Sequence, residues 1–261
     1  MRTAQEVLAG PRLAVHAVTC ADDRPGWSEP EASGAVDRVQ VVLVRRGGFR
    51  LASEGRDFTV DRLTGYVELP GQERAFAHPA GGDSCTAVTV DGGLWRELTG
   101  DGRSLPPAFH VDGALDVAHR RLLLAGDPFT AVDELAVLLG RAFRGHRLPV
   151  TAGPGARTLA DRARDAVLAE QALRLEDLAR ALDVSPAHLS RTFRHHMGMT
   201  LGRFRNRVRV DRALDRLQDG DALAAVAADL GFADQAHLTR VVKAETGSPP
   251  GALRAAVRAG G

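Results

Sequence analysis

The segment Asp221–Gly251, DALAAVAADLGFADQAHLTRVVKAETGSPPG, constrains the fold more tightly than any other stretch of the chain. Its first part, Ala222–Leu230, repeats apolar residues at the spacing that gathers them on one face of a helix. These residues are Leu223, Val226, Ala227 and Leu230. Asp221 stands where a carboxylate can accept from the backbone N–H groups of a helix start, and Gly231 can end the helix in the left-handed conformation. The sequence therefore predicts a short helix bounded by Asp221 and Gly231.

A second helix is predicted over Gln235–Thr246, with Asp234 as its N-cap and Gly247, followed by two prolines, as its stop. Leu238 and Val242 are four residues apart and face inward. The opposite face carries only side chains that can donate hydrogen bonds: Gln235, Thr239, Arg240 and Lys243. A short helix, a tight turn and a donor-rich second helix are typical of a helix-turn-helix DNA reader. The alternative is an ordinary helical hairpin with a solvated polar face.

Leu175–Gly198, LEDLARALDVSPAHLSRTFRHHMG, repeats this design upstream. Asp183 holds the position of Gly231, and Ser185 is the expected N-cap of the second helix, with Pro186 at the first helical position, where its missing N–H costs nothing. The inward residues are Leu178, Ala179, Leu182, Leu189 and Phe193, and the outward residues are Ala187, Ser190, Arg191 and Arg194. Two copies of one pattern favour the DNA reader over the hairpin.

The stretch from about Leu159 to Arg258 resembles the DNA-binding domain of the AraC-type transcriptional regulators. The resemblance is carried by LEDLARALDVSPAHLSRTFRHHMGMTLGRF and by VAADLGFADQAHLTRVVKAETGSPPGALR, with its GF-x-DQ-x-H-x-x-R core and closing TG-x-x-P. Asp183 departs from a usual glycine, Val242 from a usual phenylalanine, and Gly251–Leu253 lacks the usual aromatic residue. The resemblance implies a sequence-specific regulator that binds a double-stranded DNA operator through two modules, at about 175–198 and 222–247.

The base-reading residues are expected to be Arg191, Gln235 and Arg240, because arginine can bond bidentately to guanine and glutamine to adenine in the major groove. Arg191 and Arg240 lie six residues beyond the caps of their helices, at positions that resemble those the family uses for base contact. Shorter side chains on the same faces, Ala187, Ser190 and Thr239, complete the expected base contacts. Arg194, Lys243 and His237 are expected to contact phosphate. For Arg240 the alternative is a salt bridge to a neighbouring carboxylate.

The modules are separated by Leu201–Leu217, LGRFRNRVRVDRALDRL, a predicted helix that can hold both readers on one side of the duplex. Its inward residues are expected to be Phe204, Val208, Leu214 and Leu217. Its six arginines, at 203, 205, 207, 209, 212 and 216, are expected to project widely. Several of them are expected to pair with Asp211, Asp215 and the domain core, and only a minority to touch DNA.

Charge divides the chain into two domains. Residues 1–155 hold 17 Arg and 20 Asp or Glu, a balance of −3, whereas residues 156–261 hold 17 Lys or Arg and 13 Asp or Glu, a balance of +4. The basic half is the helical half, which suits phosphate contact. The Pro- and Gly-containing stretch Arg144–Ala156 is the expected boundary. We therefore expect an effector-binding and dimerisation domain at 1–150 and a DNA-binding domain at 151–261.

The N-terminal domain is expected to be rich in β-structure. Short runs of high β propensity alternate with Gly, Pro or Asp, which suggests a sandwich or a small barrel. The runs are Val36–Val44, Phe49–Ala52, Asp57–Val60, Tyr66–Leu69, Arg74–His78 and Thr86–Val90. The resemblance implies a cupin-like β-barrel sensor with flanking helices. The fold class is then α+β in two domains, with an all-α C-terminal domain of two helix-turn-helix modules.

The barrel offers few metal ligands. Cys20, His78 and Cys85 are its soft ligands besides His16, and the His-x-His pair of metal-binding cupins does not occur in the sequence. Isolated cysteines are usually small buried hydrophobes. We therefore expect no metal site, no cofactor and no catalytic residues, and keep a metal-dependent cupin enzyme as the alternative function.

Two helices, Ala114–Leu124 and Thr130–Phe143, are predicted after the strands. The second carries an apolar stripe of Val132, Leu135, Ala136, Leu139 and Phe143. The stripe either covers the open end of the barrel or forms a dimer contact, which the resemblance favours. We therefore expect a homodimer that meets along Val132–Phe143.

The sequence thus predicts a one-component transcription regulator, with a small-molecule effector and, for an activator, RNA polymerase as further partners. A constitutive dimeric regulator whose barrel binds nothing is the other alternative. No apolar stretch long enough to span a membrane and no signal-peptide pattern occur, so we expect a cytoplasmic protein without membrane contact.

Overall fold

The computed structural model describes residues 2–22, 25–32, 37–53, 55–100, 108–144, 154–170 and 174–258. The chain divides into two compact units, one of residues 1–111 and 115–145 and the other of residues 112–114 and 146–261. The predicted boundary between residues 150 and 151 lies outside the described residues. Among the helices that are described, none is long and apolar enough to cross a membrane.

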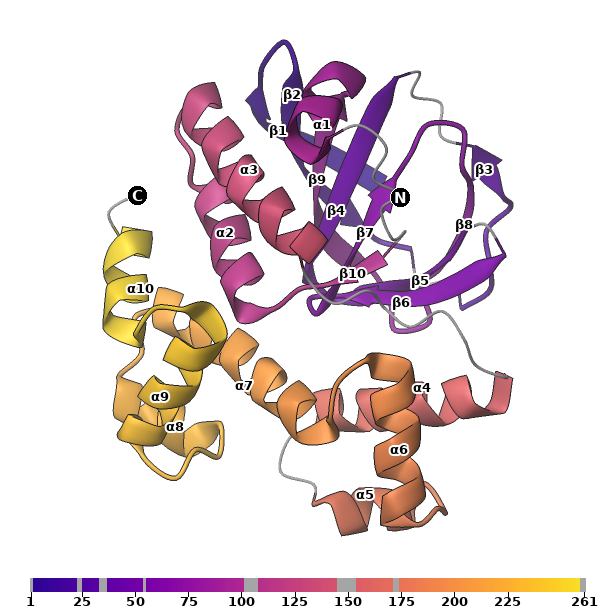
Figure 1. Cartoon of the computed structure of the whole chain (residues 1–261), viewed down its shortest axis with the longest axis vertical. Coiled ribbons are helices and arrows are strands. Elements are labelled where there is room, and N and C mark those ends of the chain that lie inside the picture. Colours follow the sequence, from indigo (N-terminus) through magenta and orange to yellow (C-terminus); the bar gives the residue numbers. More distant parts are fainter. Residues whose placement is uncertain are drawn as a thin grey trace. The chain divides into compact units, whose positions relative to one another are not determined.

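The first unit is built on one antiparallel sheet that curls into an open half-barrel (Figure 1). Its strands are β1 (Arg2–Ala9), β2 (Leu13–Cys20), β3 (Glu31–Ala32), β4 (Arg38–Arg46), β5 (Gly48–Ser53), β6 (Arg56–Asp61), β7 (Thr64–Glu68), β8 (Glu73–Ala77), β9 (Asp83–Asp91) and β10 (Ala108–His110). They follow the order β1-β2-β9-β4-β7-β6-β5-β8-β3, with β10 beside β7. The sheet turns its corner between β6 and β7, which share only the pair Asp61 and Thr64.

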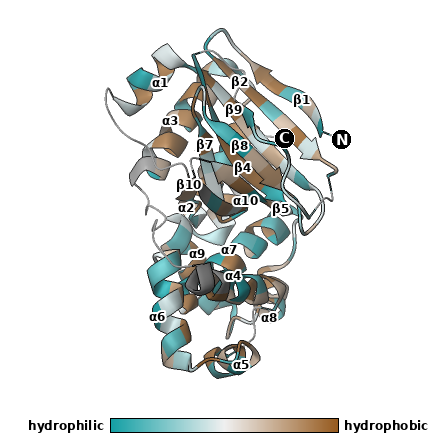
Figure 2. Cartoon of the chain, turned by 90° about the vertical axis from the view of Figure 1, so that its right-hand side faces the viewer, coloured by the Kyte–Doolittle hydropathy of each residue, from teal (hydrophilic) through white to brown (hydrophobic). Residues whose placement is uncertain are grey.

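Both faces of the central strands are covered, so β4 is apolar almost throughout instead of alternating with polar residues. One face packs on α1 (Gly92–Thr99), α2 (Gly113–Leu123) and α3 (Pro128–Arg144) and receives alternate residues of β2, β4 and β9. This core includes Val15, Val41, Val88, Phe109, Leu115 and Leu138. The opposite face, with Val18, Val42 and Ala87, lines a cavity. Figure 2 shows the resulting band of apolar residues along β4.

The six predicted strands correspond to β4 to β9, whereas β1, β2, β3, β10 and α1 were not predicted. Both predicted N-terminal helices are confirmed as α2 and α3. The proposed dimer stripe on α3 is wrong. Leu135 and Leu139 are 0% and 1% exposed within the core of the same chain, Val132 packs beside that core, and Ala136 faces solvent. The side chain of Phe143 lies outside the described residues.

The second unit is all helical (Figure 1). Its helices are α4 (Pro154–Ala169), α5 (Leu175–Ala181), α6 (Pro186–Met197), α7 (Leu201–Gln218), α8 (Leu223–Asp229), α9 (Gln235–Thr246) and α10 (Pro250–Arg258). The first module is α5 and α6, packed with α4, and the second is α8 and α9, packed with α7 and α10. Both predicted modules are therefore confirmed as elements, with α7 continuous between them.

Candidate nucleic-acid interface

In the first module, helix α6 is held in position by its two caps and by its buried inner face. The Ser185 Oγ accepts a hydrogen bond from the His188 N–H at 3.2 Å, Pro186 opens the helix, and Gly198 closes it in the left-handed conformation. Leu189 and Phe193 are fully buried, and the Phe193 ring meets Phe204 of α7 at 5.4 Å between centroids. The predicted caps and inner residues of this helix are confirmed.

The second module repeats this construction in α9. The Asp234 Oδ1 accepts from the His237 N–H at 2.6 Å, Gly247 ends the helix with a φ of 81°, and both Leu238 and Val242 are fully buried. The turns before the two helices also match, because Asp183 (φ 56°) and Gly231 (φ 70°) are both left-handed.

The predicted cap of the shorter helix is wrong. Helix α8 starts from Ala222, with no side-chain hydrogen bond at the cap, and the Asp221 carboxylate instead lies 2.5 Å from Nε of Arg216. The guanidinium of Arg216 offers the carboxylate a full positive charge, whereas a backbone N–H offers only a partial one. The ion pair therefore takes the carboxylate away from the helix start.

The predicted DNA-contacting side chains share the outer faces of α6 and α9. Ala187, Arg191, Arg194, Gln235, Arg240 and Lys243 are exposed, and Ser190, His237 and Thr239 are half-buried. Within the described part of the chain, no ion pair involves Arg191, Arg194, Arg240 or Lys243. The salt bridge considered for Arg240 is therefore not formed there. Figure 2 shows the hydrophilic residues along α6.

Two of the half-buried residues have local partners. The Thr239 hydroxyl donates to the carbonyl of Gln235 at 2.9 Å, so its oxygen can act only as an acceptor toward another group. The His237 Nδ1 accepts from the Ala233 N–H at 3.2 Å, and the ring stands edge-on to Phe232. Accepting at Nδ1 leaves Nε2 as the protonated nitrogen, and a phosphate contact from it stays a prediction.

The arginines of α7 are less available than the sequence suggested. Arg207 is 5% exposed and donates to the Met199 sulfur, because it lies three residues after Phe204 on the inward stripe. Arg212 donates to the carbonyl of Leu168, and Arg216 binds two aspartates. Of the six arginines, only Arg203 is exposed in the described helix. The expectation that all six project is wrong, and the expected loss of some of them to the domain core is confirmed for Arg207. The aspartates that bind Arg216 are Asp221 and Asp229, which were not the expected partners.

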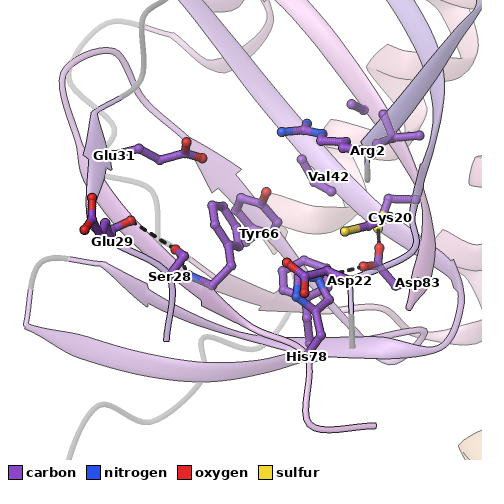
Figure 3. Close-up of a pocket in the computed structure, with 15 residues that line it drawn as sticks. Arg2, Cys20, Asp22, Ser28, Glu29, Glu31, Val42, Tyr66, His78 and Asp83 are labelled. Carbon is purple, nitrogen blue, oxygen red and sulfur yellow. Dashed lines mark hydrogen bonds and ion pairs between the residues drawn. The ribbon is translucent and has the colours of Figure 1, made fainter. Parts of the chain in front are cut away.

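The first unit contains a second candidate site, a cavity of about 330 Å³ inside the half-barrel (Figure 3). Cys20, His78 and Cys85, which the sequence singled out as soft ligands, all line it. Asp83 lies among them and was missed. The sequence signal for Asp83 is its position two residues before Cys85 in a strand, which puts both side chains on one face.

Residues 178–256 match the family model described as a helix-turn-helix domain. The chain is also similar over part of its length to uncharacterized HTH-type transcriptional regulators. One, from Haemophilus influenzae, is 36% identical over 70 residues, which are 26% of this chain and 24% of that protein. Another, from Bacillus subtilis, is 32% identical over 85 residues, which are 32% of this chain and 27% of that protein. The matches thus span only about a quarter of the length of these relatives.

Solved structures similar to the chain are more distant. ToxT of Vibrio cholerae with a bound unsaturated fatty acid is 11% identical, with 94% of this chain and 95% of that chain covered and a TM-score of 0.38. An AraC-type DNA-binding domain protein of Chromobacterium violaceum is 22% identical, with 40% and 96% covered and a TM-score of 0.38.

Proposed function

We propose that the protein is an AraC-type, sequence-specific transcription regulator that reads two successive major grooves through the helix-turn-helix domain matched at residues 178–256. The proposal rests on two helices of similar construction, α6 and α9. Their outward arginine and lysine side chains form no ion pair in the described part of the chain. Arginine and glutamine on such a face are suited to bind guanine and adenine edges.

The spacing of the modules suits this role. Helix α7 has 18 residues, which gives it a length of about 27 Å at 1.5 Å per residue. Successive turns of the major groove recur every ~34 Å. A continuous helix with one reader packed near each end can therefore hold both readers in neighbouring grooves on one side of the duplex.

The first unit is the proposed sensor. Its cavity of about 330 Å³ is within the range of small-molecule sites, roughly 300–1,000 Å³. An effector held there biases DNA binding by the second unit, and activation would proceed through contact with RNA polymerase. We also propose a homodimer, because linking two readers makes the second binding event intramolecular. Since α3 buries its leucines internally, the dimer contact lies elsewhere.

Selection of DNA from a random pool by the full-length protein tests the proposal. The enriched sequences should share two short elements about 10 base pairs apart, one for each recognition helix. The logarithm of affinity should fall with the logarithm of salt concentration at a slope of roughly −5 to −7, as five to eight phosphate contacts require.

The Arg191→Ala, Arg240→Ala double variant should lose the enrichment. Arg121→Ala, at an exposed arginine on α2, is the matched control and should keep it. A pool without a common sequence, or an affinity that hardly changes with salt, would contradict the proposal.

A further inference from the structure

The cavity of the half-barrel brings together three side chains that bind metals in proteins. One ligand atom each from Cys20, His78 and Asp83 lies within 4.8 Å of the other two. Cys20 ends β2 directly opposite Asp83, the first residue of β9, and His78 follows β8. Figure 3 shows these three side chains at one end of the cavity.

The connection between β8 and β9 fixes this arrangement. Gly82 packs on the backbone of Cys20, where a Cβ atom would collide with the Cys20 carbonyl oxygen. Only glycine permits this close approach of two chain segments. His78 and Asp83 are 7% and 6% exposed, so burial holds the imidazole and the carboxylate in place.

The distances suit a small tetrahedral ion. His78 Nε2 lies 3.1 Å from Asp83 Oδ1, close to the ~3.3–3.6 Å between neighbouring ligand atoms around zinc with bonds of about 2.0–2.3 Å. Cys20 is only half-buried, so rotation of its side chain can bring the sulfur to bonding distance.

A second sulfur lies beside the same carboxylate. Cys85 Sγ donates to Asp83 Oδ2 at 2.7 Å. The two cysteines do not suit a disulfide. Cys85 lies opposite Val18 in the sheet, two residues from Cys20, so the two cysteines are diagonal neighbours. The Cα atoms of diagonal neighbours are about 7–8 Å apart. This distance exceeds the usual Cα separation in a disulfide, about 4.4–6.8 Å.

The charge of the cavity favours a cation. Among the described residues that line it, four are carboxylates, Asp22, Glu29, Glu31 and Asp83, and one is an arginine, Arg2. A pocket lined by one sign of charge attracts ligands of the opposite sign. A mixed sulfur, nitrogen and oxygen set selects a borderline-soft ion over magnesium or calcium, which prefer oxygen ligands alone.

We propose that Cys20, His78 and Asp83 bind one divalent ion of the zinc class, with Cys85 or a molecule in the cavity at the fourth position. On binding, the ion takes the place of the Cys20 thiol proton, which passes to the solvent, and no electron is transferred. The ligand of the proposed sensor is then a metal ion. Metal binding itself does not depend on the proposed function, and only its role in regulation rests on it.

Titration of the reduced, metal-free, full-length protein with Co²⁺ tests the site, because cobalt reports its own ligands in absorption. We expect a thiolate-to-cobalt charge-transfer band and tetrahedral visible bands that saturate at one ion per chain and disappear on addition of Zn²⁺. Cys20→Ser should remove the charge-transfer intensity of that sulfur. Cys20→Ser and the near-isosteric Asp83→Asn each remove a direct ligand, so each should weaken metal binding by about 100-fold or more, at least the upper end of the cost of losing an outer-shell partner.

His16→Gln is the matched control, since His16 lies on β2 outside the cluster. It should leave the affinity unchanged, and circular dichroism should confirm that every variant is folded. Three outcomes would overturn the proposal. They are saturable cobalt binding without a sulfur band, equal metal affinities of the wild type and Cys20→Ser, and binding of organic amines but not of metals. Because the titration contains no DNA, a protein that binds metal but no operator would refute the regulator and leave the metal site standing.

Discussion

Asp183 and Gly231 hold the same place in the two modules and take the same left-handed conformation, with φ values of 56° and 70°. The left-handed region costs a non-glycine residue about 1–2 kcal/mol, although aspartate tolerates it better than most. Asp183 is exposed and has no hydrogen bond or ion pair from its side chain in the described structure. The first turn therefore carries strain that the second avoids.

Replacing Asp183 by glycine should stabilise the helical unit by up to about 1 kcal/mol, because strain relief exceeds the extra entropy that glycine loses on folding. Gly231→Ala should destabilise it by about 1–2 kcal/mol. A Cβ at Gly231 would meet only Arg209, at 3.6 Å, so this variant tests the backbone conformation without a steric clash. Thermal unfolding followed by circular dichroism measures both changes, and a rise in midpoint for Gly231→Ala would refute this account of the turns.

At the scale of elements, α3 shows where periodicity is ambiguous. Apart from the exposed Ala136, the described residues of its apolar stripe pack on the core of its own chain and not on a partner. An amphipathic helix has the same sequence pattern whether it covers a core or an interface. Only the pairing of distant strands decides which surface the helix meets.

The burial of α3 makes a stability prediction. Leu135→Ala should cost the first unit about 2–5 kcal/mol, because its side chain is fully buried among α1, α2 and the sheet. Phe129→Ala, on the same helix but 84% exposed, should change stability by less than about 0.5 kcal/mol. Denaturant unfolding followed by tryptophan fluorescence reports on this unit alone, since both tryptophans, Trp27 and Trp95, lie in it. Equal effects of the two substitutions would contradict the packing.

The helical unit could be predicted from sequence because its signals are local. Ser185 and Asp234 each lie next to the helix that they cap, and the apolar spacing lies within single helices. The Asp221 cap failed because the competing partner, Arg216, lies in the preceding helix. The cavity could not be predicted, because Cys20 meets Asp83 only through the register of β2 on β9. Strand β1 escaped prediction because it is an exposed edge without an apolar face.

At the scale of the whole molecule, charge and fold divide together. The balance of −3 over residues 1–155 and +4 over residues 156–261 separates an acidic cavity-bearing half from a basic helical half. The net positive charge of the second half attracts the phosphates of DNA, whereas the net negative charge of the first half does not. We therefore propose that the second unit recognises DNA and that the first recognises a ligand.

The affinity of three variants for every single-base variant of the selected operator tests the central claim most directly. Arg191→Ala and Gln235→Ala should each cost ~1–3 kcal/mol at the cognate site and relax preference at one base position, in different halves of the operator. Arg194→Ala, three residues beyond Arg191 on α6, should instead weaken binding to all sequences alike. A uniform loss across all operators for Arg191→Ala and Gln235→Ala would contradict the claim that α6 and α9 read bases.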